Sequence, residues 1–435
     1  MKQIDPNHHF GQKVESLEED VTFEYRFFQK ILVNIASIYM RYKSKKFLDF
    51  KYTTQKITPP IADTKKQYLL YLHIPFCKTL CPYCSFHKFI FKEETAREYF
   101  ILLRKEMDLV KSLGYDFVSL YIGGGTTTVL PDELVKTIEH AKKLFNIKDV
   151  SCEGDPLIDD EMVALLSKKV DRLSVGVQTT NDAMLKKIKR YKKFGVAKDQ
   201  QQNTSKAIGK FSIVNIDLIF NLPNQTQEML EADLKNIIQL NPEQISLYPL
   251  MHSPSVKSKM EKHLGKLHND NEVNFYNVIL QTLHQKYDQI SSWTFSKKGI
   301  HSFDEYVVEY NEYIGLGSGS FSFIEDTLYI NTFSLEEYKK SIEDGNLSLE
   351  RFKTYKKSDI VRYQLMLDMF SNNVNFEKYK SYKVLFILLK YLGILKKDYS
   401  STTQFGRYIL LVLMKEFYIG MDFVRDSSRI RIKKS

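Results

Sequence analysis

Largely apolar runs alternate with amphipathic stretches of helical period from residue 67 to about residue 287. The runs QYLLYLHI and FVSLYI predict two strands, and further strands are predicted at 148–152, 171–177, 211–220 and 243–249. Helices are predicted near 159–168, 181–190, 226–240 and 270–287. Continuously apolar strands that alternate with helices indicate a parallel sheet covered by helices. About six such units predict an α/β fold, either a partial (β/α)6 barrel or a doubly wound sheet.

The two ends of the chain have a different pattern. Near the N-terminus, Phe23, Phe27, Ile31, Ile35 and Ile38 recur at helical spacing, which predicts an amphipathic helix that packs on another part of the protein. The sequence KITPPIADTKK then predicts a linker. After about residue 325, apolar helices such as VLFILLKYLGIL predict a mainly helical domain that completes or covers the barrel mouth. The expected units are therefore 1–65, 66–325 and 326–435.

Composition narrows the class of protein. The 435 residues are 43% hydrophobic and 27% charged, as in an ordinary globular protein. No apolar stretch approaches the roughly 18 residues of a membrane span, and the start MKQIDPNHHFGQ lacks the apolar core of a signal peptide. The net charge of +10 is not accompanied by a nucleic-acid-binding motif, so we expect solvated basic faces or attraction to an acidic ligand. A cytoplasmic protein without a nucleic-acid partner is predicted.

Three of the four cysteines lie in one short tract, YLHIPFCKTLCPYCSF. Cys77, Cys81 and Cys84 place three thiolates on one loop, which argues against a disulfide framework and for a reducing compartment. Three sulfurs leave a zinc site one ligand short, although His73 or His87 would be within reach as the fourth. They hold three irons of a [4Fe–4S] cluster and leave the fourth iron open to a ligand.

Further polar and glycine-rich motifs follow the predicted strands, where the functional residues of parallel α/β folds gather. GGGTTT offers backbone amides to a ligand, although a plain tight turn is the alternative. Glu153 and Asp217 are suited to ribose hydroxyls or an ammonium group, or to helix capping. Gln178 and Arg190 are suited to a carboxylate or to adenine. S-adenosylmethionine (SAM) offers these groups, and electron transfer into its sulfonium from an open-site cluster yields a 5′-deoxyadenosyl radical.

The string HIPFCxxxCxYCxF resembles the HemN/HemW family of radical SAM proteins. The resemblance covers residues 67–335 and includes GGGT, the EGDP tract that begins at Glu153, RLSVGVQ, DLIFNLP and GLGSGS, in that order. It implies a partial (β/α)6 radical SAM barrel, with a [4Fe–4S] cluster and SAM as cofactors and an electron donor such as flavodoxin or ferredoxin. It implies that Cys77, Cys81 and Cys84 bind the cluster. The implied SAM-binding positions are Tyr71, Tyr83, Gly124, Gly125, Thr126 and Glu153, whereas Gln178, Arg190 and Asp217 match positions that contact a second SAM in the oxygen-independent coproporphyrinogen oxidase.

Two departures from the family leave the function open. Phe86 stands where the coproporphyrinogen oxidase branch has another cysteine. The resemblance gives HemW heme chaperones and anaerobilin synthases a phenylalanine at this position as well. The HemW heme-binding motif HNxxYW appears as the tract Tyr310 to Ile314, YNEYI, without its histidine and tryptophan. The first hypothesis is a HemW-like protein that handles heme or a heme precursor. The propionate groups of such a ligand would suit the net positive charge of the chain. The alternatives are an oxygen-independent coproporphyrinogen III oxidase and a zinc-stabilised binding module, so the chain is either an oxidoreductase or a chaperone.

Overall fold

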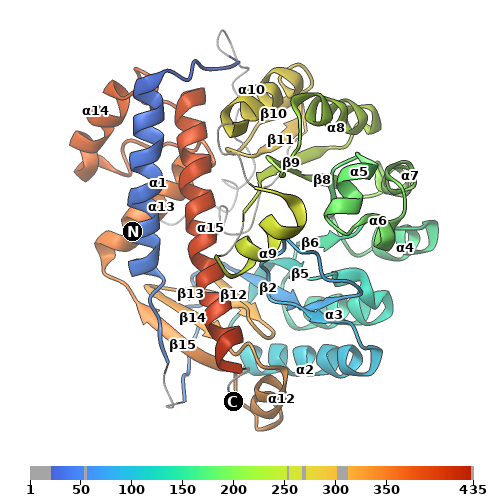
Figure 1. The fold of residues 1–435 in the computed structure, drawn as a ribbon. Coiled ribbons are helices and arrows are strands. Elements are labelled where there is room, and N and C mark those ends of the chain that lie inside the picture. The colour runs from blue at the N-terminus through green and yellow to red at the C-terminus, as the bar shows by residue number, and fades with distance from the viewer. Residues whose placement is uncertain (1–20, 53–55, 252–253, 267–270, 301–311, 433–435) are drawn as a thin grey trace.

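The computed structural model describes residues 21–52, 56–251, 254–266, 271–300 and 312–432 (Figure 1). Six neighbouring strands of its main sheet are parallel and follow the order of the chain. They are β2 (Tyr68–Ile74), β5 (Phe117–Gly124), β6 (Asp149–Gly154), β7 (Arg172–Gln178), β8 (Ile213–Phe220) and β9 (Gln244–Pro249). This arrangement confirms the predicted partial (β/α)6 barrel.

Helices connect these parallel strands, as crossover connections require. They are α2 (Glu93–Ser112), η1 (Thr127–Val129), α3 (Pro131–Leu144), α4 (Asp160–Leu166), α5 (Asp182–Lys187), α6 (Tyr191–Phe194), α7 (Ala197–Ala207) and α8 (Gln227–Leu240). After β9 come α9 (Pro254–Leu264) and α10 (Glu272–Leu283). Figure 1 shows α2, α3, α4, α7 and α8 on the side of the sheet remote from α15 (Gln404–Ile432).

The sheet continues beyond both edges of the parallel core. Beside β2 lie β12 (Tyr313–Leu316), β13 (Phe321–Ile324), β14 (Thr327–Asn331), β15 (Leu349–Thr354) and β1 (Lys51–Tyr52). Beside β9 lie β11 (Thr294–Lys297) and β10 (Tyr287–Gln289). The predicted boundary at residue 325 falls in the turn between β13 and β14, which are hydrogen-bonded to each other. The barrel and its two flanking segments thus share one sheet.

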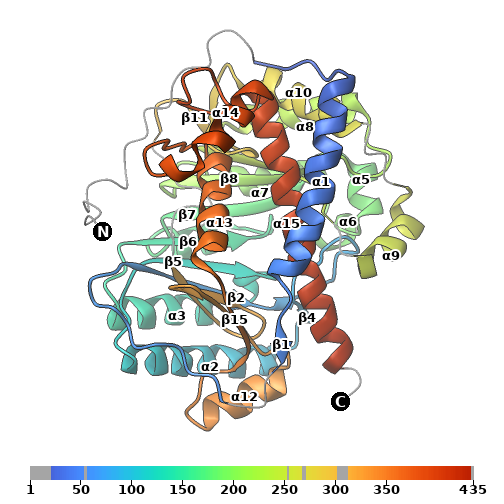
Figure 2. The ribbon, with the colours of Figure 1, turned by 90° about the vertical axis from the view of Figure 1, so that its left-hand side faces the viewer.

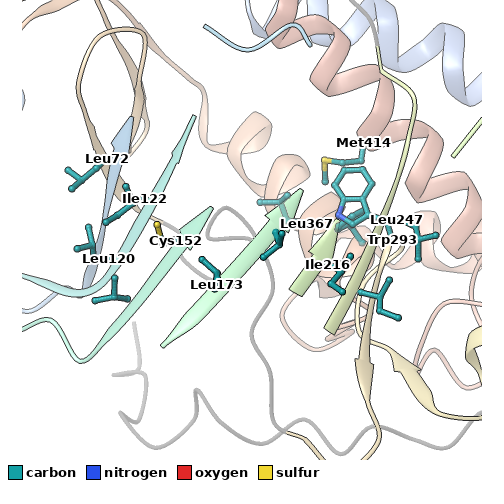
Figure 3. Close-up of a cluster of buried hydrophobic side chains, with 14 of the residues drawn as sticks. Leu72, Leu120, Ile122, Cys152, Leu173, Ile216, Leu247, Trp293, Leu367 and Met414 are labelled. Atoms are coloured by element: carbon teal, nitrogen blue, oxygen red, sulfur yellow. The ribbon is translucent and has the colours of Figure 1, made fainter. Parts of the chain in front are cut away.

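Side chains alternate between the two faces of each parallel strand. One face carries apolar residues such as Leu72, Ile122, Leu173 and Ile216, which belong to the main core (Figure 3). The residues next to these in sequence point to the other side, where a cavity lies at the strand ends. Because both faces are covered, even the strands that carry site residues are largely apolar.

The C-terminal segment contains α12 (Leu335–Glu343), α13 (Lys357–Phe370), η3 (Lys380–Tyr382), α14 (Lys383–Tyr391) and α15. α15 crosses the open side of the barrel (Figure 1), as the predicted helical cover requires. Its residues Met414, Phe417 and Met421 line the cavity. Within the described part of the chain, no helix combines the length and the apolar character needed to cross a membrane.

The predicted N-terminal helix is present as α1 (Phe27–Phe47), which packs beside α15 (Figures 1 and 2). The predicted packing face is wrong, however. Val33 and Ser44 are the buried residues of α1, whereas Phe27, Ile31, Ile35 and Ile38 are exposed. The opposite side of the helix packs because it carries the polar partners of α15: Arg41 binds both carboxylate oxygens of the buried Glu416 at 2.7 Å.

Candidate functional site

A cavity of about 360 Å³ lies between the carboxyl ends of the parallel strands and α15. Every residue that the sequence predicts for the site lines this one cavity. These residues are Tyr71, Cys77, Cys81, Tyr83, Cys84, Gly124, Gly125, Thr126, Glu153, Gln178, Arg190 and Asp217. Six strands and the loops after them therefore converge on one place, although the individual roles of the residues stay predictions.

The cysteine loop is held by its own backbone and by a lysine. Cys77 ends β3 (Phe76–Cys77), which pairs in parallel with β4 (Phe89–Ile90). Lys88 closes the loop from the other side, since its Nζ donates to the carbonyl of Cys84 at 2.7 Å. Burial raises the pKa of the Cys77 thiol, while Lys193 and a hydrogen bond from Thr126 act in the opposite direction.

The fourth cysteine has a different environment. Cys152 lies buried on β6 within the apolar core, 3.1 Å from the hydroxyl of Thr127. Burial raises its pKa to about 12. Its thiol therefore stays protonated, while the three thiols of the loop open to the cavity.

Two glycines at the end of β5 allow the strand to approach the cysteine loop. Gly124 has φ +125°, and a Cβ there would lie 2.8 Å from the ring of His73. A Cβ on Gly125 would lie 2.6 Å from the carbonyl oxygen of Phe76 and 3.0 Å from Cys77 Sγ. Thr126 follows directly, with its hydroxyl 3.8 Å from the same sulfur. The glycines are thus required by close packing, of Gly124 against β2 and of Gly125 against the start of the cysteine loop, which a plain tight turn would not demand.

Two half-buried carboxyl groups face the cavity, Glu153 from β6 and Asp217 from β8. Glu153 accepts hydrogen bonds from the Gly124 amide at 3.0 Å and from the Tyr121 hydroxyl at 3.2 Å. Asp217 accepts from Ser174 at 2.8 Å, and burial raises its pKa to about 6. Burial likewise raises the pKa of Glu153 to about 7. Neither carboxylate caps a helix, and both line the cavity.

Arg190 presents an unsatisfied donor at the same site. The side chain is buried, its guanidinium donates to the carbonyl of Gly176, and it lies 4.3 Å from the ring of Phe194. Its Nε has no hydrogen-bond partner among the described residues. Gln178, at the irregular end of β7, adopts φ +75°, a conformation that is costly for a residue with a side chain. A buried guanidinium N–H and a strained polar residue are features of a site that receives a ligand.

The two histidines considered as zinc ligands are hydrogen-bonded to the protein. His73 Nδ1 lies 2.9 Å from the Tyr71 hydroxyl, and its Nε2 lies 3.1 Å from the carbonyl oxygen of His87. His87 Nε2 lies 3.1 Å from the hydroxyl of Ser318. Across the described ranges, no three His, Cys, Asp or Glu side chains converge closely enough to hold a single metal ion. The donor set of three thiols beside a glycine turn and a buried guanidinium fits a larger cluster with an amino-acid-like ligand.

The sequence predicts a helical cover for the barrel mouth, but not which side chains form the wall of the cavity that faces the strands. This wall comes from α15, from Tyr363 and Leu367 on α13, and from Phe47 at the end of α1. Its one cation from α15 is Arg425, which pairs with Asp422 at 2.6 Å. The apolar period of α15 was visible in the sequence, but the individual side chains that it would bring to the cavity were not.

Phe86, the position that separates the branches of the family, contacts α15. The Arg425 guanidinium lies 5.0 Å from the centre of the Phe86 ring. Arg429 Nη2 donates to the carbonyls of Ser85 at 2.8 Å and Phe86 at 2.6 Å. The C-terminal helix therefore holds the cysteine loop from outside.

The structure describes only part of the tract Tyr310 to Ile314, which stands at the position of the heme-binding motif. Tyr310 and Asn311 lie outside the described residues. Tyr313 lines the cavity, and Ile314 is buried in β12. The described part of the tract thus reaches the cavity through one aromatic side chain.

Comparisons with known proteins agree with this geometry. Residues 71–237 match the family model described as the radical SAM superfamily. The chain is 31% identical over 284 residues to the heme chaperone HemW of Bacillus subtilis, which covers 62% of this chain and 74% of that protein. It is 28% identical over 334 residues to the oxygen-independent coproporphyrinogen III oxidase of Helicobacter pylori, covering 70% and 72% respectively. The solved structure of coproporphyrinogen III oxidase (HemN) from Escherichia coli has the same fold, with a TM-score of 0.67 at 22% identity over 81% of this chain and 90% of that one.

Proposed function

The chain belongs to the HemN/HemW family of radical SAM proteins, and we propose that it is a HemW-like member that binds a [4Fe–4S] cluster and SAM and handles heme or a porphyrin precursor. The observation that carries this proposal is the convergence of the cysteine loop, the glycine turn and the buried polar residues on one cavity. Three free thiols in one loop also suit a reducing cytoplasm.

Each part of the site has a role in the proposal. Cys77, Cys81 and Cys84 hold the cluster, and the backbone at Gly124 and Gly125 admits the amino-acid end of SAM. Cluster and SAM together supply one-electron cleavage of a C–S bond, a route to hydrogen abstraction from unactivated carbon. The unsatisfied N–H of Arg190 is available to an anionic ligand group at the second SAM position.

The substrate class is supported by the wall that faces the strands. Phe417, Tyr418 and Met421 of α15 give this wall a broad aromatic and apolar surface. Lys193 adds a positive charge to the cavity, where Arg425 is paired with Asp422. A flat macrocycle with propionate groups has both the apolar area and the negative charge that such a wall selects.

One alternative function has a specific observation in its favour. Gln178, Arg190 and Asp217 all line the cavity, and a second SAM at these positions would suit oxidative decarboxylation of coproporphyrinogen III. Phe86 argues against it, because the extra cysteine of that branch is replaced by a ring that packs against Arg425. An electron donor such as flavodoxin or ferredoxin would serve either function.

The first test is cofactor binding by the full chain. After anaerobic reconstitution we expect broad absorbance at about 400 nm, and 5′-deoxyadenosine should form from SAM under reduction. Cys81→Ser should abolish both signals, whereas Cys152→Ser, the matched control in the core, should retain both. A colourless wild-type protein, or a Cys81→Ser variant that keeps its cluster and activity, refutes the cofactor assignment.

The second test separates the two functions. The reconstituted protein is incubated with SAM and coproporphyrinogen III, and in parallel it is titrated with heme. Stoichiometric heme binding without formation of protoporphyrinogen IX supports the HemW-like function. Conversion of coproporphyrinogen III to protoporphyrinogen IX overturns it in favour of the oxidase.

A further inference from the structure

α1 carries an apolar stripe that faces away from the protein. Phe27, Ile31, Ile35, Ile38 and Tyr42 recur three or four residues apart, which places them on one side of the helix. All five are exposed, Phe27 by 79% and Ile38 by 66%. The buried residues of α1 lie on the opposite side, against α15. The stripe therefore has no partner among the described residues, although apolar surface of this extent marks an interaction site.

The charges around this stripe have one sign. α1 contains Lys30, Arg41, Lys43, Lys45 and Lys46 and no acidic residue between Phe27 and Phe47. Arg41 is paired with Glu416, but the four lysines are exposed beside the stripe. An apolar stripe flanked by lysines is the pattern of a helix that lies in the interface of an anionic membrane.

α14 repeats the pattern on the same side of the molecule. Its residues Val384, Leu388 and Tyr391 are exposed on one helix face, Val384 and Tyr391 by 81% each, and Lys383 is exposed beside them. Figure 2 looks onto this side and shows α1 and α14 in front of the barrel. Two separate helices on this side of the molecule thus each carry an exposed face of apolar and basic residues.

We propose that α1 and α14 form a docking surface for an anionic lipid bilayer, with α1 lying in the headgroup region parallel to the membrane plane. Apolar burial supplies the attachment, and the lysines supply the preference for negative lipid. The helix does not cross the bilayer, which agrees with the lack of a spanning helix among the described residues.

A second copy of the chain is a poorer occupant. Two α1 helices packed stripe to stripe would bring their lysines together, with no acidic residue on either helix to neutralise them. Like charges in such an interface oppose association. An anionic bilayer instead neutralises these charges and accepts the apolar side chains at once.

The docking surface is connected to the cavity. Phe47, the last residue of α1, lines the cavity, and its ring stacks on Tyr355 at 4.1 Å. The membrane-facing helix thus ends at the proposed substrate site. The docking proposal rests only on the exposed faces of α1 and α14, so it stands or falls independently of the proposed function.

The test is flotation of the full chain with phosphatidylcholine vesicles, with and without phosphatidylglycerol. We expect binding to the anionic vesicles only, and weaker binding at high salt. Ile35→Glu with Ile38→Glu should reduce binding at least about tenfold, because two charges replace inserted apolar groups. The matched control is Ile101→Glu with Leu165→Glu, which makes the same change at exposed positions on α2 and α4, remote from α1 (Figure 1); it should bind as the wild type does.

A second variant tests the electrostatic part. Lys43→Gln with Lys45→Gln should weaken binding to anionic vesicles by roughly 25-fold, since each lysine near such a surface contributes roughly fivefold. Thermal melts and light scattering of all variants report folding and oligomeric state. The proposal is overturned if the wild type binds neither vesicle, if it binds both equally, or if the stripe variant still floats. A wild-type dimer that the stripe variant converts to a monomer, without vesicle binding by either, assigns the surface to a second copy instead.

Discussion

Arg429 is expected to stabilise the cysteine loop from α15, and Arg429→Ala measures by how much. Its Nη2 donates to the carbonyls of Ser85 at 2.8 Å and Phe86 at 2.6 Å. Hydrogen bonds from a charged donor contribute roughly 1.5–3 kcal/mol each when buried. The Arg429 side chain is 30% exposed and Phe86 is exposed as well, so water competes for both carbonyls. We therefore expect the two hydrogen bonds together to stabilise the closed loop by about 1.5 kcal/mol, which corresponds to about tenfold in a rate or an equilibrium constant.

The assay follows loss of the cluster from reconstituted protein in the presence of an iron chelator. Arg429→Ala should bleach at about 400 nm about tenfold faster than the wild type, because the loop opens more often. Arg431→Ala is the matched control. It removes the same charge two residues away, but Arg431 is 52% exposed and contacts Glu350, at 3.9 Å, and the ring of Tyr52, at 4.3 Å, rather than the cysteine loop. Equal bleaching rates for Arg429→Ala and the wild type refute the reasoning, and equal acceleration by both variants would assign the effect to charge alone.

Three further changes test other contacts of the fold. Gly125→Ala places a Cβ 2.6 Å from the Phe76 carbonyl; urea unfolding should show a loss of about 2 kcal/mol, and calorimetry should show weaker SAM binding. Arg41→Ala leaves the carboxylate of Glu416 buried without its cationic partner. Because Arg41 is 63% exposed, we expect the free energy of unfolding to fall by about 2 kcal/mol rather than by the full cost of a broken buried pair. Arg41→Lys should recover part of this loss in the same urea assay. Burial lowers the pKa of His73 from 6.5 to about 4, so the unfolded state binds the proton first and stability falls as the pH drops from 6.5 toward 4. Melts across this range should show the wild type losing roughly 3 kcal/mol relative to His73→Gln, and parallel curves for the two proteins would contradict the assignment.

The parallel core could be predicted from the sequence because its signals are local. Each strand is a short apolar run, and each motif directly follows a strand, so the fold itself brings Cys77, Gly124, Glu153 and Asp217 to one edge of the sheet. Residue spacing and strand order were sufficient for this part. No long-range contact had to be known in advance.

The wall of the cavity that faces the strands could not be predicted in the same way. Met414, Phe417 and Met421 lie on a helix far from the motifs in sequence, and periodicity shows that a helix has an apolar face without showing what covers it. The same limit explains the error at α1. Its strongest apolar period belongs to the exposed stripe, whereas the packed face is fixed by Arg41 and its partner on α15.

Phe86 shows how the structure changes the interpretation of a single substitution. In the sequence it appears only as a missing cysteine, which argues against one branch of the family. In the structure its ring lies under Arg425, and its carbonyl accepts from Arg429, four residues further along α15. The position has therefore become a contact between the cysteine loop and the helix that walls the cavity. A cysteine at this position would lack the ring that Arg425 covers. Phe86→Cys, which introduces the residue of the oxidase branch, would therefore also weaken the contact between the C-terminal helix and the proposed cluster site.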